Sequence, residues 1–593
     1  MDRDHHKNLF KAMADPAFYP HATDRMEERE THISKIFLVG DYVYKVKKPF
    51  NLSFLDFTTL EKREHFCRQE ILLNRRLTSD VYIDVIPITF ENGKYTLDGI
   101  GEPVEYAVKM RRLSDDSSMI SMLRAKKVKT ADLETLARLL ASFYNKTAKC
   151  EQMNCIEVWE SVKKNCEENF SQTEAFTSEL PDEQEILKNQ IVDDAICQSQ
   201  AFTNQIVDAA YQSQAFTNKI LDSRIFQIIR SAVSSFVFRK QPLFYNRVTG
   251  GKIRDCHGDL RTDHIYFISD KLPSNSNYGN NSSKNDAVLN HCISDYKEIQ
   301  IIDCIEFNER FRLQDIASDL AFLAMDMDSE GFADQASLLL NYYVKYADDP
   351  GIFILLDFYK CYRAMVRCKV NCLRLNSDDI DKQERDNIVE TARKYLELAY
   401  GYTLKFARPK LFILCGMQAS GKSTIAKELS EFMGIELLRS DIIRKELFKI
   451  APHKSSVSQF EQGIYSKSTT NLTYGRMFLQ AQETLKAGRS VILDATFSKK
   501  HLRDEARTLA QDMNTEILFV ECYADEAILK KRLIQRESAP SVSDARITHF
   551  EQFKSKAEPL EELDESNHIR IDTSNSLKDC VKQILSQTYY SII

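Results

Sequence analysis

Short apolar runs separated by turn residues dominate the first 110 positions of the chain. The runs KIFLVG, DYVYKV, VIPITF, KYTLDG and EYAVKM mix apolar and polar side chains in the way that half-buried strands do. One longer stretch, residues 59–77, instead has the spacing of a helix. The pattern therefore predicts a strand-rich region, interrupted by one long helix, at the start of the chain.

Helical spacing dominates residues 130–245 and 311–405, and short strand signals lie between these stretches. After residues 407–410 the pattern changes to alternating strands and helices, which is typical of an α/β sheet. The prediction is a multidomain protein of mixed α/β and α+β class, with a parallel sheet in its last part. The predicted domains are residues 1–113, 114–405 and 409–593.

Two segments look like insertions into this plan. Residues 190–204 are repeated almost unchanged at 205–218, and two copies are too few to stack into a solenoid. We predict that the duplicated segment, 190–218, extends a helical region locally. Residues 272–286 are rich in Asn, Ser and Gly, which predicts a surface loop.

Composition narrows the class of protein. Of the 593 residues, 43% are hydrophobic and 28% charged, and the formal net charge is −7, which argues against a generally basic nucleic-acid coat. The 14 cysteines form no C-x-x-C pair, as in proteins of a reducing compartment. No apolar run approaches the ~20 residues that span a bilayer. We therefore expect a cytoplasmic protein without a membrane partner.

A phosphate-binding motif follows the apolar run KLFILCG at residues 410–416. GMQASGKS fits G-x₄-GK[ST], and the helix-like TIAKELSEFM comes directly after it. The glycines let backbone N–H groups surround phosphate oxygens, and the helix N-terminus adds about half a positive charge. This predicts ATP and Mg²⁺ as cofactors, with Lys422 at the β/γ-phosphates and the Ser423 hydroxyl on the metal. The predicted loop residues are Gly416, Met417, Gln418, Ala419, Ser420, Gly421, Lys422, Ser423 and Thr424.

Three further positions bear on that chemistry. Asp494 ends the strand-like SVILDAT and suits a carboxylate that holds Mg²⁺. Asp441 and Arg444 lie three apart at a helix start, where a base and a phosphate-binding guanidinium would share one face. A helix-capping aspartate with a solvated arginine is the open alternative.

Basic residues provide two more features of this region. Arg532 and Arg536 lie four apart on a predicted helix and either close over the triphosphate or form a solvated face. Lys499, Lys500 and Arg503 are predicted to form a small solvated basic patch. A nucleic-acid end would want a basic channel, so this acceptor is neither supported nor excluded.

GMQASGKS, RSDIIR, VILDATF and KRLIQRE together resemble the small P-loop kinases that include polynucleotide 5′-hydroxyl kinases, gluconate kinase, chloramphenicol phosphotransferase and zeta toxins. The resemblance covers most of residues 410–560 and implies a kinase with Asp441 as base and Arg444 as a phosphate-gripping side chain. Because these relatives phosphorylate unrelated hydroxyls, the acceptor stays open between a small molecule and a nucleic-acid 5′-end.

A second constellation lies earlier in the chain. In CHGDLRTDHIYF, Asp259 follows His-Gly, and Asp303 ends the strand-like IQIID; such carboxylates accept a hydroxyl proton and hold Mg²⁺. Upstream, Lys45 ends a strand and Glu70 lies in the long helix, as in a pair that positions ATP phosphates. His264 stands five residues after Asp259, at a position that is asparagine in most kinases, and is predicted as a metal ligand beside Asp303. Because imidazole is a poor ligand for Mg²⁺, Asp263 or water in its place is the open alternative.

These residues look like the aminoglycoside phosphotransferase branch of the protein-kinase-like fold. The whole chain resembles a bacterial two-domain family that fuses such a region to a P-loop kinase. The resemblance implies a bilobal N-terminal fold, with Asp315 and Asp319 in structural roles. The prediction is an ATP-dependent kinase whose N-terminal region is a kinase or, lacking a glycine-rich loop before Lys45, a pseudokinase. Two alternatives stay open: an ATP-hydrolysing switch with a binding module, and a toxin or antibiotic-modifying kinase.

Overall fold

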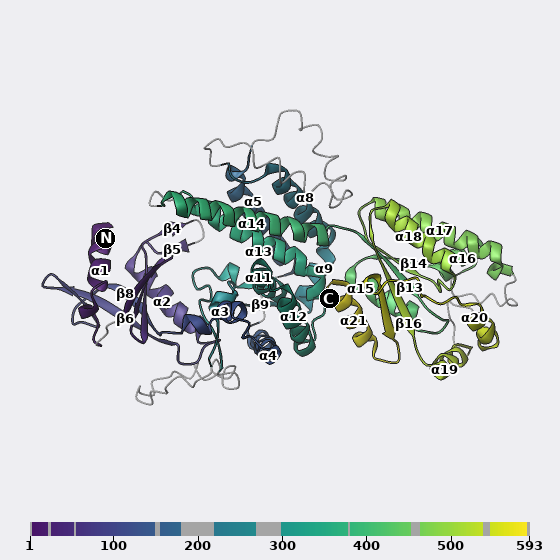
Figure 1. Ribbon diagram of the computed structural model, residues 1–593, viewed down its shortest axis with the longest axis horizontal. Helices are drawn as coiled ribbons and strands as arrows, with labels where there is room; N and C mark the ends of the chain where they lie inside the picture. Colours follow the sequence, from purple (N-terminus) through teal and green to yellow (C-terminus); the bar gives the residue numbers. More distant parts are fainter. Residues whose placement is uncertain are drawn as a thin grey trace. The chain divides into compact units, whose positions relative to one another are not determined.

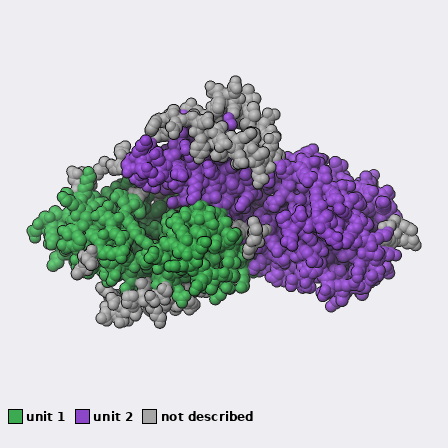
Figure 2. Space-filling view, in the orientation of Figure 1, with its two compact units in different colours: residues 1–154, 247–349 green, residues 155–246, 350–593 purple. Residues whose placement is uncertain are grey.

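The computed structural model describes residues 3–21, 25–31, 33–52, 55–148, 154–178, 219–268, 298–376, 380–451, 463–537 and 546–589. The duplicated segment 190–218 and the Asn-rich segment 272–286 lie outside these ranges. The chain forms two compact units (Figure 2). Unit 1 comprises residues 1–154 and 247–349, and unit 2 comprises residues 155–246 and 350–593. The three predicted domain ranges divide the chain differently and stay a prediction.

Unit 1 begins with a six-stranded antiparallel sheet of order β1-β2-β3-β8-β6-β7 (Figure 1). Its strands are β1 (Met26–Glu30), β2 (Ser34–Val39), β3 (Tyr42–Lys47), β6 (Tyr82–Glu91), β7 (Lys94–Leu97) and β8 (Pro103–Arg111). The strand-rich pattern of the first 110 residues is thereby confirmed. The short strands β4 (Asn51–Leu52) and β5 (Leu55–Asp56) pair with each other.

One helix packs on each face of this sheet. Residues of α1 (Arg3–Met13) share a core with Tyr44 and Val46 of β3. Residues of α2 (Leu60–Asn74), the predicted long helix, share a second core with β6 and β8. Because side chains alternate along a strand, Lys45 and Lys47 point to the face opposite Tyr44 and Val46. Both lysines therefore face α2.

The rest of unit 1 is mainly helical, with two short antiparallel strand pairs. Its helices are α3 (Met119–Arg124), α4 (Thr130–Lys146), α11 (Ile316–Ser329) and α12 (Ala333–Ala347). The strand pairs are β9 (Ile253–Asp255) with β12 (Leu313–Asp315) and β10 (Ile265–Phe267) with β11 (Ile299–Ile301). The register of β10 and β11 pairs Ile265 with Ile301, so the residues just before β10 lie beside those just after β11.

Unit 2 combines a helical part with an α/β part. The helical part contains α5 (Cys155–Thr173), α8 (Ser223–Arg239), α13 (Ile352–Arg374) and α14 (Lys382–Phe406), and α9 (Gln241–Thr249) follows α8. The long helices α13 and α14 pack against each other and α14 packs against α8. Among the described helices, none combines the length and apolar character that a bilayer crossing requires.

The α/β part is built on a parallel five-stranded sheet of order β14-β15-β13-β16-β17 (Figure 1). Its strands are β13 (Lys410–Cys415), β14 (Glu436–Arg439), β15 (Val491–Asp494), β16 (Glu516–Tyr523) and β17 (His568–Asp572). Its helices are α15 (Lys422–Met433), α16 (Ser440–Leu447), α17 (Lys467–Lys486), α18 (Lys500–Asp512), α19 (Glu526–Glu537), α20 (Phe550–Lys556) and α21 (Leu577–Tyr589). This confirms the predicted parallel sheet and the strands at 410–416 and 490–496.

Every residue of β13 is buried, as expected for a central strand covered on both faces. Helices α15 and α21 pack together, while α17 and α18 pack together and share a core with the strands. After β13 the chain first adds β14 and β15 on one side and later β16 and β17 on the other. Ligands of such sheets bind at the carboxyl ends of the strands where this direction reverses. That point is the end of β13.

Candidate functional sites

The predicted phosphate-binding loop joins the buried end of β13 to the start of α15. Gly416 has φ +128°, and a Cβ there would lie 2.2 Å from the backbone oxygen of Cys522. Gly421 has φ +90° at the N-cap of α15, next to the side chain of Thr573. Both positions therefore require glycine for conformation and space. The loop wraps around the N-terminus of α15, where backbone N–H groups and the helix dipole favour an anion.

Lys422 lies on the first turn of α15 and is buried. Its Nζ donates to the carbonyl oxygen of Met417 at 2.6 Å and contacts the Ser420 hydroxyl at 3.4 Å. Within the described part of the chain, Lys422 forms no ion pair. Burial lowers the pKa of its ammonium, while the negative charge of Asp494 opposes that effect. A buried ammonium without a carboxylate partner suits an anionic ligand.

Asp494 is buried at the end of β15, as the predicted metal carboxylate should be. Parallel pairing sets it beside Arg439 at the end of β14, and the two side chains form an ion pair of 3.1 Å. Ser423 is half-buried on the first turn of α15 and Thr424 beside it is exposed. Gln418 in the loop buries its Oε1 atom, which accepts no hydrogen bond from the described residues.

Asp441 and Arg444 lie on one face of α16, as predicted from their spacing. Arg444 donates to Asp441 at 3.0 Å and stacks on the ring of Tyr465, 4.8 Å from its centroid. Arg444 is buried, and its Nε has no hydrogen-bond partner among the described residues. The arginine is therefore not a solvated side chain, and it holds a half-buried carboxylate in place.

The two predicted arginines of α19 have different surroundings. Arg532 donates to the Thr573 carbonyl at 2.7 Å and to the Ala419 carbonyl of the phosphate-binding loop at 3.3 Å. Arg536 forms no ion pair within the described residues. Burial lowers the pKa of Arg536, and the charges of Asp441 and Asp494 act in the opposite direction. Arg532 thus supports the loop, and Arg536 lies within the field of both carboxylates.

The predicted basic patch after β15 is wrong in one of its members. Arg503 is fully buried, bonded to Glu562 and to the carbonyl oxygens of Phe497 and Pro559. Lys499 pairs with the exposed Glu558 at 3.0 Å. The sequence shows that Arg503 is charged but not that loop carbonyls surround it. The role of Arg503 in holding that loop therefore could not be predicted from the sequence.

In unit 1 the structure brings together the predicted Lys45, Glu70 and Asp303. The Lys45 Nζ lies 2.9 Å from Glu70 and 2.6 Å from Asp303. Lys47, two residues along the same strand, bonds to Glu70 at 2.7 Å and to Glu306. The nearby carboxylates raise the pKa of Lys45 despite its burial, and the two lysines lower the pKa of Glu70.

The loop after β9 is held by Asp319 of α11. Its carboxylate accepts the backbone N–H groups of His257 at 3.0 Å and Gly258 at 2.9 Å, and the hydroxyl of Tyr144 at 2.8 Å. The other predicted structural residue, Asp315, caps α11 and pairs with buried Arg247 at 2.7 Å. Both aspartates therefore have structural partners, and the loop they support presents Asp259.

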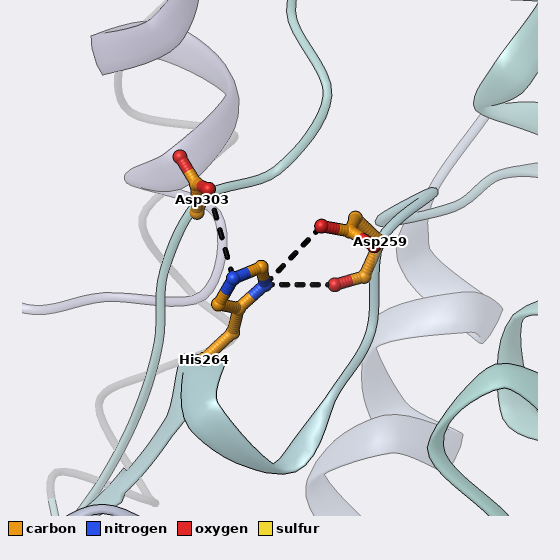
Figure 3. Close-up of side chains that lie close together, drawn as sticks. All are labelled: Asp259, His264 and Asp303. Atoms are coloured by element: carbon orange, nitrogen blue, oxygen red, sulfur yellow. Dashed lines mark hydrogen bonds and ion pairs between the residues drawn. The ribbon is translucent and has the colours of Figure 1, made fainter. Parts of the chain in front are cut away.

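Asp259, His264 and Asp303 lie together, with one ligand atom of each within 4.8 Å of the others (Figure 3). The pairing of β10 with β11 explains this, because His264 precedes β10 and Asp303 follows β11. The Asp303 backbone has φ +64°. Lys45 lowers the pKa of Asp303 well below its usual range, although burial opposes this.

Several residues at the two sites were missed from the sequence. Lys47 could have been found, since it lies two positions from Lys45 on one strand and must share its face. Glu306, Arg439 and Thr573 carry no local signal: each reaches its site through tertiary packing or strand register. Arg261, which contacts Asp259, lies within CHGDLRTDHIYF, and its charge two residues after Asp259 is the signal that could have found it.

The comparisons with known proteins agree with the loop geometry. Residues 411–560 match the family described as AAA domain. Uncharacterized proteins of Mycobacterium tuberculosis and Mycobacterium bovis are 27% identical over 525 residues, which is 88% of this chain and 88% of each relative. The predicted P-loop domain is thus confirmed.

Solved structures with some likeness include a gluconokinase from Sinorhizobium meliloti, 17% identical, with a TM-score of 0.23 over 30% of this chain and 91% of that one. Another is the Mycobacterium tuberculosis APS kinase CysC, in complex with AMPPNP and APS. It is 20% identical, with a TM-score of 0.24 over 30% of this chain and 97% of that one. Scores this low establish no shared structure, so the proposals below rest on the site residues.

Proposed function

We propose that the P-loop domain of unit 2 transfers the terminal phosphate of ATP to a hydroxyl group. The observation that carries this proposal is a second carboxylate at the carboxyl edge of the parallel sheet, where α16 begins directly after β14. Asp494 ends β15, where a magnesium carboxylate is expected, and Asp441 is held separately on α16 by Arg444. The negative charges of Asp441 and Asp494 both act on Arg536. Hydrolysis alone gives no reason for Asp441 and a buried Arg444.

The residues of the loop fit a triphosphate with its metal. The N-terminus of α15, Lys422 and Arg536 supply positive charge that no carboxylate within the described residues neutralises by direct pairing. Ser423 and Asp494 offer the oxygen donors that Mg²⁺ prefers. Bound Mg²⁺ would offset charge on the β- and γ-phosphates. Lys422 and Arg536 stabilise the charge that develops on the transferred group.

Asp441 acts as the base in this proposal. It accepts the proton of the acceptor hydroxyl as the acceptor oxygen bonds to the γ-phosphorus and the bond from phosphorus to the β,γ-bridging oxygen breaks, leaving ADP. The ion pair with Arg444 orients the carboxylate toward its substrate. The stacked, half-satisfied guanidinium of Arg444 offers a further contact to an anionic group of donor or acceptor. The acceptor is either a small molecule or a nucleic-acid 5′-end.

The test is phosphate transfer from γ-labelled ATP to a panel of 5′-hydroxyl RNA and DNA, sugars, nucleosides and aminoglycosides. Full-length protein is compared with Lys422→Ala and, as a matched lysine control in unit 1, Lys45→Ala. We expect one acceptor class to gain label, Lys422→Ala to lose at least about 10³-fold in rate, and Lys45→Ala to retain it. Label released only as free phosphate with every acceptor would favour an ATP-hydrolysing switch instead.

A second proposal concerns unit 1, which we propose binds nucleotide as a protein-kinase-like domain of the aminoglycoside phosphotransferase type. The Lys45–Glu70 pair beside Asp303, with Asp259 on a neighbouring loop, supports it. Nucleotide binding is measured in a Lys422→Ala background, where Lys45→Ala should remove the remaining binding. Label transfer that survives Lys422→Ala would make unit 1 an active kinase; binding without transfer would make it a pseudokinase.

A further inference from the structure

A second lysine lies beside the Lys45–Glu70 pair of unit 1. Lys47 is two residues along β3 from Lys45, points to the same face of the sheet, and bonds to Glu70 and Glu306. We propose that Lys47 is a positioning residue for Lys45, which it makes available to a phosphate group by holding Glu70. The inference rests on the proposed nucleotide binding of unit 1 and deepens it.

The two carboxylate oxygens of Glu70 are held differently. Lys47 donates a hydrogen bond to Oε2 at 2.7 Å. The Lys45 ammonium lies 2.9 Å from Oε1, but this oxygen accepts no hydrogen bond from the described residues. Lys45 instead donates to Asp303 at 2.6 Å. Lys47 is therefore the hydrogen-bond donor to the Glu70 carboxylate, and the contact between Lys45 and Glu70 is electrostatic.

The two lysines differ in their access to a ligand. Lys47 is fully buried, and its ammonium lies 5.0 Å from the centroid of the Phe57 ring. Lys45 keeps 12% of its side chain exposed, and the side chain of its partner Asp303 is 43% exposed. The open side of the network is therefore at Lys45. Lys47 has no surface to offer a phosphate, so it acts on a ligand through Glu70.

The burial of Glu70 explains what Lys47 contributes. Glu70 is fully buried, and its cationic partners among the described residues are Lys45 and Lys47. Without Lys47, a phosphate that drew Lys45 away would leave a buried carboxylate unpaired, which is strongly unfavourable. With Lys47 in place, Glu70 keeps a hydrogen-bonded cation when Lys45 turns to a ligand. Although burial opposes it, the nearby carboxylates raise the pKa of both lysines, so both stay charged.

Glu306 competes with Glu70 for the charge of Lys47. It is buried and bonds to the Lys47 ammonium from the opposite partner of the network. Burial raises the pKa of Glu306, and the positive charge of Lys47 opposes this. The charge of Lys47 that offsets Glu306 does not offset Glu70. Removing the charge of Glu306 should therefore weaken the hold of Glu70 on Lys45, whereas removing Lys47 should strengthen it.

The test uses these opposite expectations. ATP and adenosine binding are measured at equilibrium in full-length protein carrying Lys422→Ala, and the ATP binding that Lys45→Ala removes is assigned to unit 1. With Lys47→Met we expect the ATP affinity of unit 1 to fall about tenfold, because Glu70 then holds Lys45 alone. With Glu306→Gln we expect it to rise about threefold, because Lys47 then offsets Glu70 alone. Adenosine has no phosphate, so its affinity should stay unchanged in both variants.

The matched control is Lys62→Met, which replaces an exposed lysine of α2 that pairs with Asp56 and should leave ATP affinity unchanged. Unchanged ATP affinity in folded Lys47→Met, or adenosine affinity that falls in parallel, overturns the inference alone. If Lys47→Met does not fold, Glu306→Gln decides: higher ATP affinity supports the inference, and equal or lower affinity overturns it. ATP binding that Lys45→Ala does not change overturns the nucleotide proposal for unit 1 together with this inference.

Discussion

The two candidate sites use positive charge in opposite ways. At the phosphate-binding loop of unit 2, Lys422 and Arg532 bond to backbone carbonyls of the loop and its neighbours. In unit 1, Lys45 and Lys47 bond to the carboxylates of Glu70, Asp303 and Glu306. Carbonyl oxygens orient a cation without neutralising it, so the loop of unit 2 keeps its positive charge for a ligand. In unit 1, carboxylates neutralise the charges of Lys45 and Lys47, and further acidic groups remain.

This difference shows that the presence of a lysine near a predicted phosphate site does not by itself indicate how strongly the site binds phosphate. Burial lowers the pKa of Lys422, whereas carboxylate neighbours raise the pKa of Lys45 and raise that of Lys47 above its ordinary value. A triphosphate that binds at the loop would stabilise the buried ammonium of Lys422. A triphosphate arriving at Lys45 would compete with Asp303 and Glu70 for the same ammonium group.

The largest effect that tests the unit 2 side of this comparison is expected from Asp441→Asn. Removing the base leaves the loop, Lys422 and Asp494 unchanged, so ATP affinity should stay within about threefold while the transfer rate falls 10²–10⁴-fold. Single-turnover transfer and equilibrium ATP binding separate the two effects. The matched control is Asp504→Asn, a half-buried aspartate on α18 that pairs with Arg507 and should leave both unchanged. Unaltered turnover in Asp441→Asn would remove the base assignment.

A stability measurement tests the unit 1 side. Lys47→Met leaves Glu70 with Lys45 alone and deprives buried Glu306 of the partner that opposes its burial, so we expect a loss of about 3 kcal/mol. Lys422→Met removes a buried ammonium whose partners among the described residues are a carbonyl and a hydroxyl, so it should leave stability unchanged or raise it.

The chain offers a reporter that assigns this loss to a unit. Its single tryptophan, Trp159, lies on α5 of unit 2 and donates to the Val237 carbonyl at 3.1 Å. In urea unfolding, Lys47→Met should shift the circular dichroism transition while the Trp159 fluorescence transition stays in place. Equal stability losses in Lys47→Met and Lys422→Met would show that the two lysines are held alike, against the contrast drawn above.

A site is easier to predict from the sequence when its residues lie close together along the chain. The phosphate-binding loop is one contiguous segment whose strand, glycines and helix all carry local signals, and Gly416 and Gly421 have the positive φ angles that the motif requires. Asp441 and Arg444 were also predictable, since three positions on a helix place them on one face. Their contact with Tyr465 depends on tertiary packing and was not.

The unit 1 site joins residues up to 259 positions apart, as in Lys47 and Glu306. A sequence pattern fixes the face of a strand, which relates Lys45 to Lys47, but not which distant loop that face meets. The contact of the Asp319 carboxylate with two consecutive N–H groups likewise follows from packing alone. The protein-kinase-like character of unit 1 accordingly remains a prediction.

The smallest expected effect concerns Lys240, another cation held by a carbonyl. It follows α8, is half-buried, and donates to the Met433 carbonyl at the last residue of α15, at 3.2 Å. Burial lowers the pKa of Lys240 to about 8, whereas an unfolded lysine has a pKa of about 10.4. Between these values the unfolded chain binds more protons, so this group makes stability rise with pH across that window.

Lys240→Met should therefore stabilise unit 2 at pH 7 by about 1 kcal/mol, a value reduced for partial exposure, and the gain should shrink as pH rises from 8 toward 10. Trp159 fluorescence in urea at several pH values measures this next to α8. The favourable interaction of a cation with a helix C-terminus, about 0.3–1 kcal/mol, opposes the gain. A net loss of stability at pH 7 would mean that this dipole interaction outweighs the cost of desolvating Lys240. Carbonyl-bound cations in unit 2 would then stabilise the fold even without a ligand.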